Sequence, residues 1–272
     1  MKAAAFDYAR PATCEEAVAL LANGFGMAKP VGGTQSLGPM LNLRLAQPEQ
    51  LVALRGIAEL RECRAEDDHV VLGGCITHAE IEDGRIDDPT QGFLPHVARG
   101  IAYRAIRNRG TLGGSLAHAD PAADWINAMP LLGAELIVVG PAGRRTVAAA
   151  DWMQGAFTTA LAEDELLAGV RIARLSRNAR WSYYKFNRKT GEFAEAIAAF
   201  LVDPARGVCR AVLGALDGAP HVIEDARALL AHPTETAVVL REAGLSGDDY
   251  ETRIHDVALQ RAARLIQEFP AR

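Results

Sequence analysis

Two glycine-rich turns hold the residues whose types and spacing are best suited to chemistry. The first is Val31-Gly32-Gly33-Thr34-Gln35-Ser36-Leu37, and the second is Arg109-Gly110-Thr111-Leu112-Gly113-Gly114-Ser115. Glycine tolerates positive φ and lets a ligand come close to the backbone, so such turns can point N–H groups at an anion. Two of them predict two bound phosphates, as in the pyrophosphate of a dinucleotide. Taken alone, either turn is more typical of a tight connection between two elements.

Other motifs for phosphate, metal and nucleophilic chemistry are absent from the sequence. Neither turn contains the Gly-Lys-Ser/Thr of a P-loop or the G-x-G-x-x-G of a Rossmann fold, and Gly24-Phe25-Gly26 lacks the third glycine. No G-x-S-x-G elbow or H-E-x-x-H pair occurs, and His118 beside Asp120 is a weak metal pair. The sequence therefore predicts no catalytic residue and no metal site in this chain.

Two acidic residues follow the second turn at the start of a predicted helix over 120–132. Asp120 is typical of a helix cap, and Asp124 lies one turn further along. Asp124 can accept hydrogen bonds from a ribose or an adenine, although a surface acid on a helix is the common alternative.

Composition and charge exclude several classes of protein. The chain has 272 residues, of which 49% are hydrophobic and 23% charged, which is typical of one large or two ordinary globular domains. The net charge is -5 and no long basic run occurs, so we expect no nucleic-acid or lipid partner. No apolar run approaches the roughly 20 residues of a membrane span, and the N-terminal apolar run stops at Asp7, too short for a secretory signal, so we expect a cytoplasmic protein.

The four cysteines do not form a metal or disulfide pattern. They are far apart, with no C-x-x-C pair: Cys14, Cys63, Cys75 and Cys209. We expect buried, reduced thiols.

The periodicity of apolar residues predicts three segments of mixed α and β structure. Thr13 and Glu16 have capping-box spacing at the start of the first helix. The first segment, 1–57, is predicted to hold strands at 3–8, 29–31 and 50–54 and a helix at 14–22. The second, 58–175, is predicted to hold strands at 69–73, 135–139, 145–148 and 166–172, helices at 77–83, 93–100 and 120–132, and the glycine turn at 110–114. The third, 176–272, is predicted to hold strands at 181–187, 195–202 and 208–216 in an antiparallel meander, then two or three helices at 221–230, 234–243 and 250–269.

Three stretches together resemble a known family. They are VGGTQSLGPMLNLRLAQPEQLVAL, IRNRGTLGGSLAHADPAADW and YYKFNRKTGEFAEA. They look like the FAD-binding medium subunit of the molybdenum hydroxylases, the group that includes aerobic carbon monoxide dehydrogenase and xanthine dehydrogenase. The resemblance covers nearly the whole chain, and its second stretch is the most specific.

The resemblance implies an α+β fold and a set of cofactor-binding residues. Residues 1–175 would form a two-lobed FAD-binding domain of the vanillyl-alcohol-oxidase (PCMH) type, with lobes at 1–57 and 58–175. Residues 176–272 would form the C-terminal domain of carbon monoxide dehydrogenase flavoproteins, with a three-stranded antiparallel sheet and a helical bundle. The pyrophosphate would be held by Lys29, Pro30, Val31, Gly32, Gly33, Thr34, Gln35, Ser36 and Leu37, and by Thr111, Gly113, Gly114 and Ser115. Asp124 would bind the adenosine, Lys185 would lie near the pyrimidine edge of the flavin, and Ile101, Leu167 and Phe193 would pack near the cofactor.

The resemblance also implies a place in a larger enzyme. A large subunit with a molybdenum cofactor would oxidise the substrate, and a small subunit with two [2Fe-2S] clusters would pass electrons to this chain. Its FAD would deliver them to an external acceptor, and the assembly would be a dimer of heterotrimers. Two alternatives stay open from the residues: a stand-alone flavin-dependent oxidoreductase of the same fold, and an assembly subunit without a cofactor.

Overall fold

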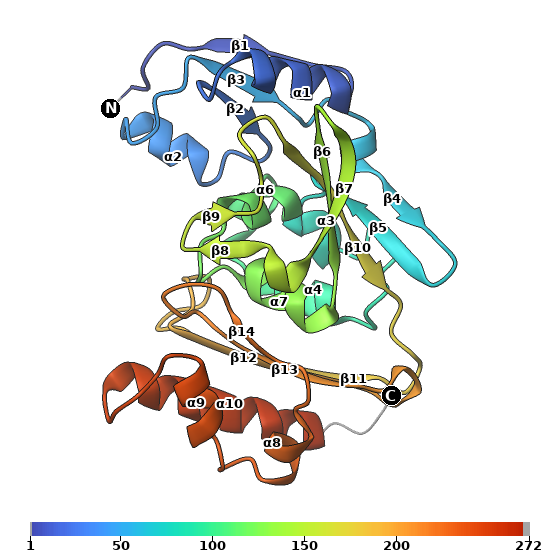
Figure 1. The fold of residues 1–272 in the computed structure, drawn as a ribbon, viewed down its shortest axis with the longest axis vertical. Helices are drawn as coiled ribbons and strands as arrows, with labels where there is room; N and C mark the ends of the chain where they lie inside the picture. Colours follow the sequence, from blue (N-terminus) through green and yellow to red (C-terminus); the bar gives the residue numbers. More distant parts are fainter. Residues whose placement is uncertain (1, 269–272) are drawn as a thin grey trace.

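Three layers follow one another from the N-terminal to the C-terminal end of the molecule (Figure 1). The computed structural model of the chain describes residues 2–268. A small parallel sheet comes first, a five-stranded sheet with several helices comes next, and a four-stranded sheet with helices beneath it comes last. This is the mixed architecture that the sequence predicts.

The first layer is a three-stranded parallel sheet with a helix on each face. Its strands lie in the order β1 (Asp7–Ala9), β3 (Gln50–Ala53) and β2 (Ala28–Val31), and its helices are α1 (Cys14–Asn23) and α2 (Leu37–Asn42). The predicted strand at 3–8 starts only at Asp7, where pairing with β3 begins. The side chain of Thr13 accepts a hydrogen bond from the N–H of Glu16 at 3.1 Å, which confirms the predicted cap of α1.

The second layer is an antiparallel sheet with its main helices on one face. The strand order is β4 (Cys63–Ala65), β5 (His69–Gly73), β10 (Leu166–Ala173), β6 (Glu135–Gly140) and β7 (Gly143–Ala148), and a small hairpin of β8 (Met153–Gly155) and β9 (Thr158–Thr159) lies nearby. The helices are α3 (His78–Glu82), α4 (Phe93–Arg99), α5 (Arg104–Arg107), α6 (Leu112–His118) and α7 (Asp124–Leu132).

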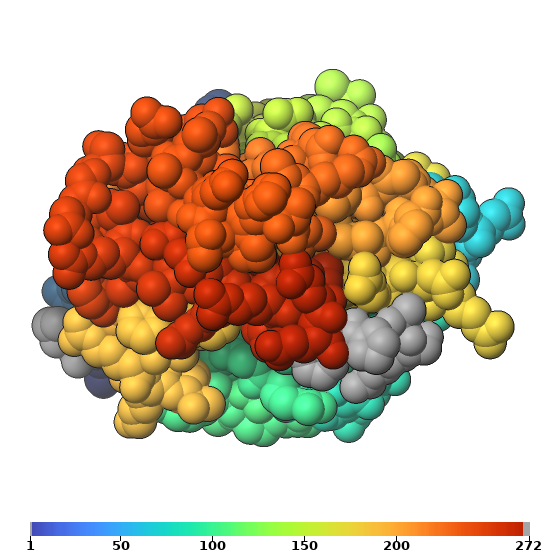
Figure 2. Space-filling model, turned by 90° about the horizontal axis from the view of Figure 1, so that it is seen from below, coloured from blue at the N-terminus to red at the C-terminus, as the bar shows by residue number. Residues whose placement is uncertain are grey.

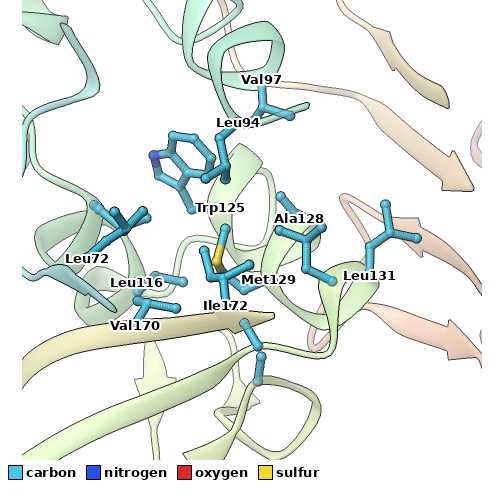
Figure 3. Close-up of a cluster of buried hydrophobic side chains, with 14 of the residues drawn as sticks. Leu72, Leu94, Val97, Leu116, Trp125, Ala128, Met129, Leu131, Val170 and Ile172 are labelled. Carbon is cyan, nitrogen blue, oxygen red and sulfur yellow. The ribbon is translucent and has the colours of Figure 1, made fainter. Parts of the chain in front are cut away.

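The largest hydrophobic core lies between this sheet and its helices. Trp125 on α7, Leu72 on β5 and Val170 on β10 are fully buried in it (Figure 3). Alternation along β6 places Val138 in this core and Val139 in a second one, where α1 packs against the opposite face of the sheet. The second core contains residues of both layers, so it fixes the first layer relative to the second.

Two local predictions near the second turn need correction. The turn at 110–114 is not a free loop, because Leu112 begins helix α6 with Thr111 as its cap. Helix α7 begins at Asp124 and not at Asp120. The carboxylate of Asp120 accepts a hydrogen bond from the N–H of Ala122 at 2.9 Å, so it closes a turn ahead of the helix.

The third layer has one more strand than the sequence predicts. Its antiparallel strands are β11 (Arg180–Phe186), β12 (Ala196–Asp203), β13 (Val208–Gly214) and β14 (His221–Ile223), and its helices are α8 (Arg227–Ala231), α9 (Ala237–Glu242) and α10 (Tyr250–Glu268). The predicted three-stranded sheet therefore lacks one strand. The helix predicted to begin at residue 221 begins instead at Arg227. Residues 221–223 pair with β13, and Asp225 accepts from the N–H of Arg227 where α8 begins. The last predicted helical residue, Phe269, lies outside the described residues.

The sheet of the third layer separates two cores. Ala199 and Leu201 of β12 contact the core of the second layer, whereas Ala198 and Phe200 pack under α10. The helices cover the face that points away from the second layer, and they form much of the surface seen from that end (Figure 2). The opposite face of the sheet points toward the second layer, so its residues can form part of the wall of the site described below.

Helix α10 is amphipathic. Its buried stripe includes Ala258, Leu259 and Ala262, whereas Arg253, Arg264 and Glu268 are exposed. Within residues 2–268, no helix is long and apolar enough to cross a membrane.

All four cysteines are free thiols. Cys14, Cys75 and Cys209 are buried and Cys63 is half-buried. Burial is the main cause that raises the pKa of Cys14 to about 12 and that of Cys75 to about 11. These two thiols therefore pack as small apolar groups and do not react as thiolates.

Candidate cofactor-binding site

One cavity of about 700 Å³ is bounded by residues from all three layers. Its volume is in the range of small-molecule and cofactor sites. All the residues that the sequence singles out for cofactor binding lie on its wall: Lys29, Pro30, Val31, Gly32, Gly33, Thr34, Gln35, Ser36, Leu37, Ile101, Thr111, Gly113, Gly114, Ser115, Asp124, Leu167, Lys185 and Phe193. The fold therefore brings together residues that are spread over most of the chain.

The first glycine turn presents free backbone donors to this cavity. Thr34 has a φ of 62°, a left-handed conformation that redirects the N–H groups after it. The side chains of Thr34 and Gln35 donate to the carbonyl oxygen of Gly33 at 2.6 and 2.8 Å. Among residues 2–268, no protein acceptor lies within hydrogen-bond reach of the N–H groups of Thr34, Gln35 and Ser36. An anion on this wall can therefore accept from the backbone.

The two turns pack directly against each other. A Cβ atom on Gly33 would lie 2.0 Å from the carbonyl oxygen of Arg109 and 2.7 Å from the Cα of Gly110. A Cβ atom on Gly32 would lie 3.0 Å from the hydroxyl of Thr111. Glycine at position 33 is therefore required by packing, because no side chain fits there.

The second turn differs from the expectation that its N–H groups bind an anion. The N–H groups of Leu112, Gly113 and Gly114 donate to the carbonyls of Ile76 and Gly74 and to the hydroxyl of Thr111, at 2.9, 2.9 and 3.0 Å. These three donors are used inside the protein, since the turn caps α6 and closes it onto the end of β5. This turn therefore contributes shape and side-chain hydroxyls to the cavity, whereas the first turn contributes backbone donors.

A buried ion pair joins the second layer to the third at the cavity wall. The carboxylate of Asp124 accepts from the ammonium of Lys185 at 2.8 Å and from the hydroxyl of Tyr183 at 2.8 Å. The side chains of Asp124 and Lys185 are only 5% and 12% exposed. Burial, with Asp124 beside it, raises the pKa of Tyr183 well above its usual range, so the phenol stays protonated and donates.

This contact bears on the roles that the resemblance implies for the two residues. Asp124 was expected at the adenosine and Lys185 at the flavin, which are opposite ends of an extended FAD. The two side chains touch, so the structure places them side by side on the cavity wall. The ammonium of Lys185 also donates to the carbonyl of Gly100 at 3.3 Å, next to Ile101. The pair therefore lies at the end of the cavity where Ile101 lines the wall.

His78 lines the cavity, but no pattern in the sequence identifies it as a site residue. It is 5% exposed, and its Nδ1 accepts a hydrogen bond from the indole N–H of Trp125 at 3.1 Å. Burial, aided by Arg107, lowers the pKa of His78 to about 3, so the ring is neutral and its proton lies on Nε2. A lone histidine after the helix cap Thr77 carries no spacing signal, and only the tertiary contact with Trp125 distinguishes it.

The neutral state of His78 predicts a specific acid sensitivity. Between pH 6.5 and about 3 the unfolded chain binds a proton at this histidine that the folded chain does not, so stability falls as the pH is lowered through that window. Within that window this one group lowers the free energy of unfolding by about 1 kcal/mol for each pH unit. We expect His78→Asn, which keeps an acceptor for Trp125, to make the free energy of unfolding less dependent on pH there. Urea unfolding of both proteins at pH values from 4 to 7 measures this dependence. Free energies of unfolding that fall in parallel with pH in the two proteins would contradict the prediction.

Comparisons with known proteins identify chains that are similar to this one. Residues 4–174 match the family described as the FAD binding domain in molybdopterin dehydrogenase. The carbon monoxide dehydrogenase medium chain of Afipia carboxidovorans is 36% identical over 94% of this chain and 95% of its own length. The nicotine 6-hydroxylase medium subunit of Paenarthrobacter nicotinovorans is 35% identical over 98% of this chain and 95% of its own length. The structure of reconstituted carbon monoxide dehydrogenase from Oligotropha carboxidovorans superposes with a TM-score of 0.89 at 34% identity, covering 98% of this chain and 99% of that one.

The chain belongs to the family of FAD-binding domains of molybdopterin dehydrogenases. It is an FAD-binding medium subunit of the molybdenum hydroxylase type, and the PCMH-type fold that the resemblance implies is confirmed. The relatives match along almost their whole length and are medium chains or subunits. This finding does not favour a stand-alone oxidoreductase or an assembly subunit without a cofactor.

Proposed function

We propose that this chain binds FAD in the cavity and is the exit for electrons from a molybdenum hydroxylase. The observation that carries the proposal is the conjunction of two glycine turns on one cavity wall, with three unused backbone donors in the first turn. FAD, when bound, supplies the capacity to accept and release electrons. The residues of this chain contribute binding, orientation and the charge around the flavin.

The phosphate end of the cofactor is assigned to the first turn. The N–H groups of Thr34, Gln35 and Ser36 would donate to the pyrophosphate, since the side chains of Thr34 and Gln35 are already held by Gly33. Lys29 lines the same cavity and is exposed, so its ammonium can offset the phosphate charge. Thr111 and Ser115 supply hydroxyls from the second turn.

We assign the flavin end of the cofactor to the part of the cavity wall that the second and third layers form. Ile101 and Leu167 would provide apolar contact, and Phe193, which is 62% exposed, would lie at the open edge. Lys185 would place a positive charge near the ring, where it favours the reduced, anionic form. Asp124 largely offsets that charge, so the pair orients the ring without a large net field.

We assign partners and domain limits by the same reasoning. The chain would take electrons from the [2Fe-2S] clusters of a small subunit, beside a large subunit with the molybdenum cofactor, in a dimer of heterotrimers, and would pass them to an external acceptor. The relatives named as medium chains support such an assembly. We place the boundary between the FAD-binding and C-terminal domains near residue 175, as the matched range of 4–174 supports.

The test is the visible spectrum of the chain purified with its partners from its native host. We expect flavin and iron–sulfur absorption together, and acid extraction should release FAD, one molecule per chain. The mass of the purified complex, measured by light scattering, should fit a dimer of heterotrimers. A purified complex without FAD would overturn the proposed function.

A further inference from the structure

Two cations hold one short segment of the cavity wall. The ammonium of Lys185 donates to the carbonyl of Gly100 at 3.3 Å. The Nη1 atom of Arg107 donates to the carbonyls of Ile101 and Ala102, both at 2.9 Å. Ile101 and Ala102 line the cavity. The position of this wall is therefore set by hydrogen bonds to three successive carbonyls.

Arg107 is itself held in one orientation. Its Nε and Nη2 atoms donate to the carboxylate of Glu82 at 2.7 and 3.0 Å, a two-point contact between α5 and α3. The two side chains are only 11% and 13% exposed. A paired guanidinium in this setting is a rigid fork, so its remaining donors are aimed at the two carbonyls.

The segment needs this support because its backbone is strained. Ala102 has a φ of 42°, in the left-handed region that alanine rarely adopts. Gly191, in the connection between β11 and β12, packs so close that a Cβ atom there would lie 2.9 Å from the carbonyl oxygen of Ala102. Without Arg107, local geometry would favour another backbone conformation, and Ile101 would move with it.

We propose that Arg107, oriented by Glu82, is a positioning residue that fixes Ile101 against the bound flavin. The inference rests on the proposed FAD site and adds to it a residue that does not line the cavity. Its effect on the cofactor is indirect, through the carbonyls of Ile101 and Ala102. Loss of Arg107 should therefore change how firmly the flavin is held and what surrounds its ring.

Arg104 offers a matched control. It lies on the same helix and pairs with the same region of α3, through Glu82 at 2.8 Å and Asp83 at 2.6 Å. Its side chain is 45% exposed, and its other hydrogen bond goes to Asn108. Among the described residues it makes no hydrogen bond to the Gly100–Ala102 segment. Loss of Arg104 removes ion pairs from α3 and leaves the wall supported.

The experiment compares Arg107→Met, Arg107→Lys and Arg104→Met in the complex purified with its partners. FAD retention during dialysis, the visible circular dichroism of the flavin and its midpoint potential are measured beside thermal unfolding. We expect Arg107→Met to weaken FAD binding by about tenfold, by analogy with the loss that removal of outer-shell contacts causes at metal sites. It should also shift the circular dichroism and the midpoint potential of the flavin. Arg107→Lys keeps the positive charge but lacks the two-pronged guanidinium. It should therefore change the flavin signals as Arg107→Met does, in a protein that is more stable than the Arg107→Met variant. Arg104→Met should leave the flavin signals unchanged.

A second substitution separates positioning from general loosening of the fold. If Arg107 acts through Ile101, then Arg107→Lys should change the flavin signals little when Ile101→Ala is already present. If the effects of Arg107→Lys and Ile101→Ala on the flavin signals are additive, the inference is wrong. It is also wrong if the unmodified complex holds FAD and the Arg107 and Arg104 variants have identical flavin signals. An unmodified complex without FAD would overturn the proposed function, and the positioning role with it.

Discussion

Replacing Gly33 by alanine should abolish stable FAD binding and destabilise the protein. The added methyl would lie 2.0 Å from the carbonyl oxygen of Arg109, so the two glycine turns must separate. Forced overpacking of this kind costs about 1–3 kcal/mol, and here the obstacle is backbone, which cannot rotate away. Separation also displaces the N–H groups of Thr34, Gln35 and Ser36 from their place on the cavity wall. FAD per chain after purification and the midpoint of urea unfolding measure the two effects.

Gly38→Ala is the control for this substitution. Gly38 lies in α2, a few residues after the same turn, and a Cβ atom there would meet only the Cβ of Thr34 at 3.7 Å, an ordinary contact. Alanine should therefore be tolerated, with a gain of about 0.5–1 kcal/mol from its better helix propensity. Normal FAD content in the Gly33→Ala protein would show that the contact between the turns does not shape the site.

Lys185→Met should be the most destabilising change at the proposed flavin end of the cavity. It leaves the buried carboxylate of Asp124 with only the hydroxyl of Tyr183 as a side-chain donor. Removal of one partner from a buried ion pair costs about 3–5 kcal/mol, because the remaining charge is desolvated and unpaired. The loss of a positive charge should also lower the midpoint potential of the flavin, whereas Asp124→Asn should raise it. Chemical unfolding and a redox titration measure these outcomes.

The double variant Asp124→Asn with Lys185→Met tests whether charge pairing is the cause. It carries neither charge, so it should recover a large part of the stability that the single changes lose. Arg188 and Glu195 are the matched control pair near the same hairpin, with a separation of 2.7 Å but with Arg188 78% exposed. Arg188→Met should cost less than about 1 kcal/mol, as for other surface pairs. A Lys185→Met cost as small as that of Arg188→Met would contradict the buried-pair interpretation.

Local signals in the sequence were sufficient for most elements. The capping residues Thr13 and Thr77 lie where the sequence places the starts of α1 and α3, since a cap depends only on residues within one turn. The apolar run at 69–73 became β5 with the predicted ends. The short strand at 221–223 was missed because a neighbour, β13, decides its conformation and three residues carry no period of their own.

Local patterns were enough to identify the residues that can form a dinucleotide site, because glycine turns and the family motifs are short stretches of sequence. Tertiary structure sets the role of each of these residues. It brought Gly33 against Arg109, used the donors of the second turn inside the protein, and paired Lys185 with Asp124. It also aimed the fork of Arg107 at the backbone beside Ile101. Contacts between residues far apart in the chain depend on how whole layers pack, and no local pattern of residues encodes that packing.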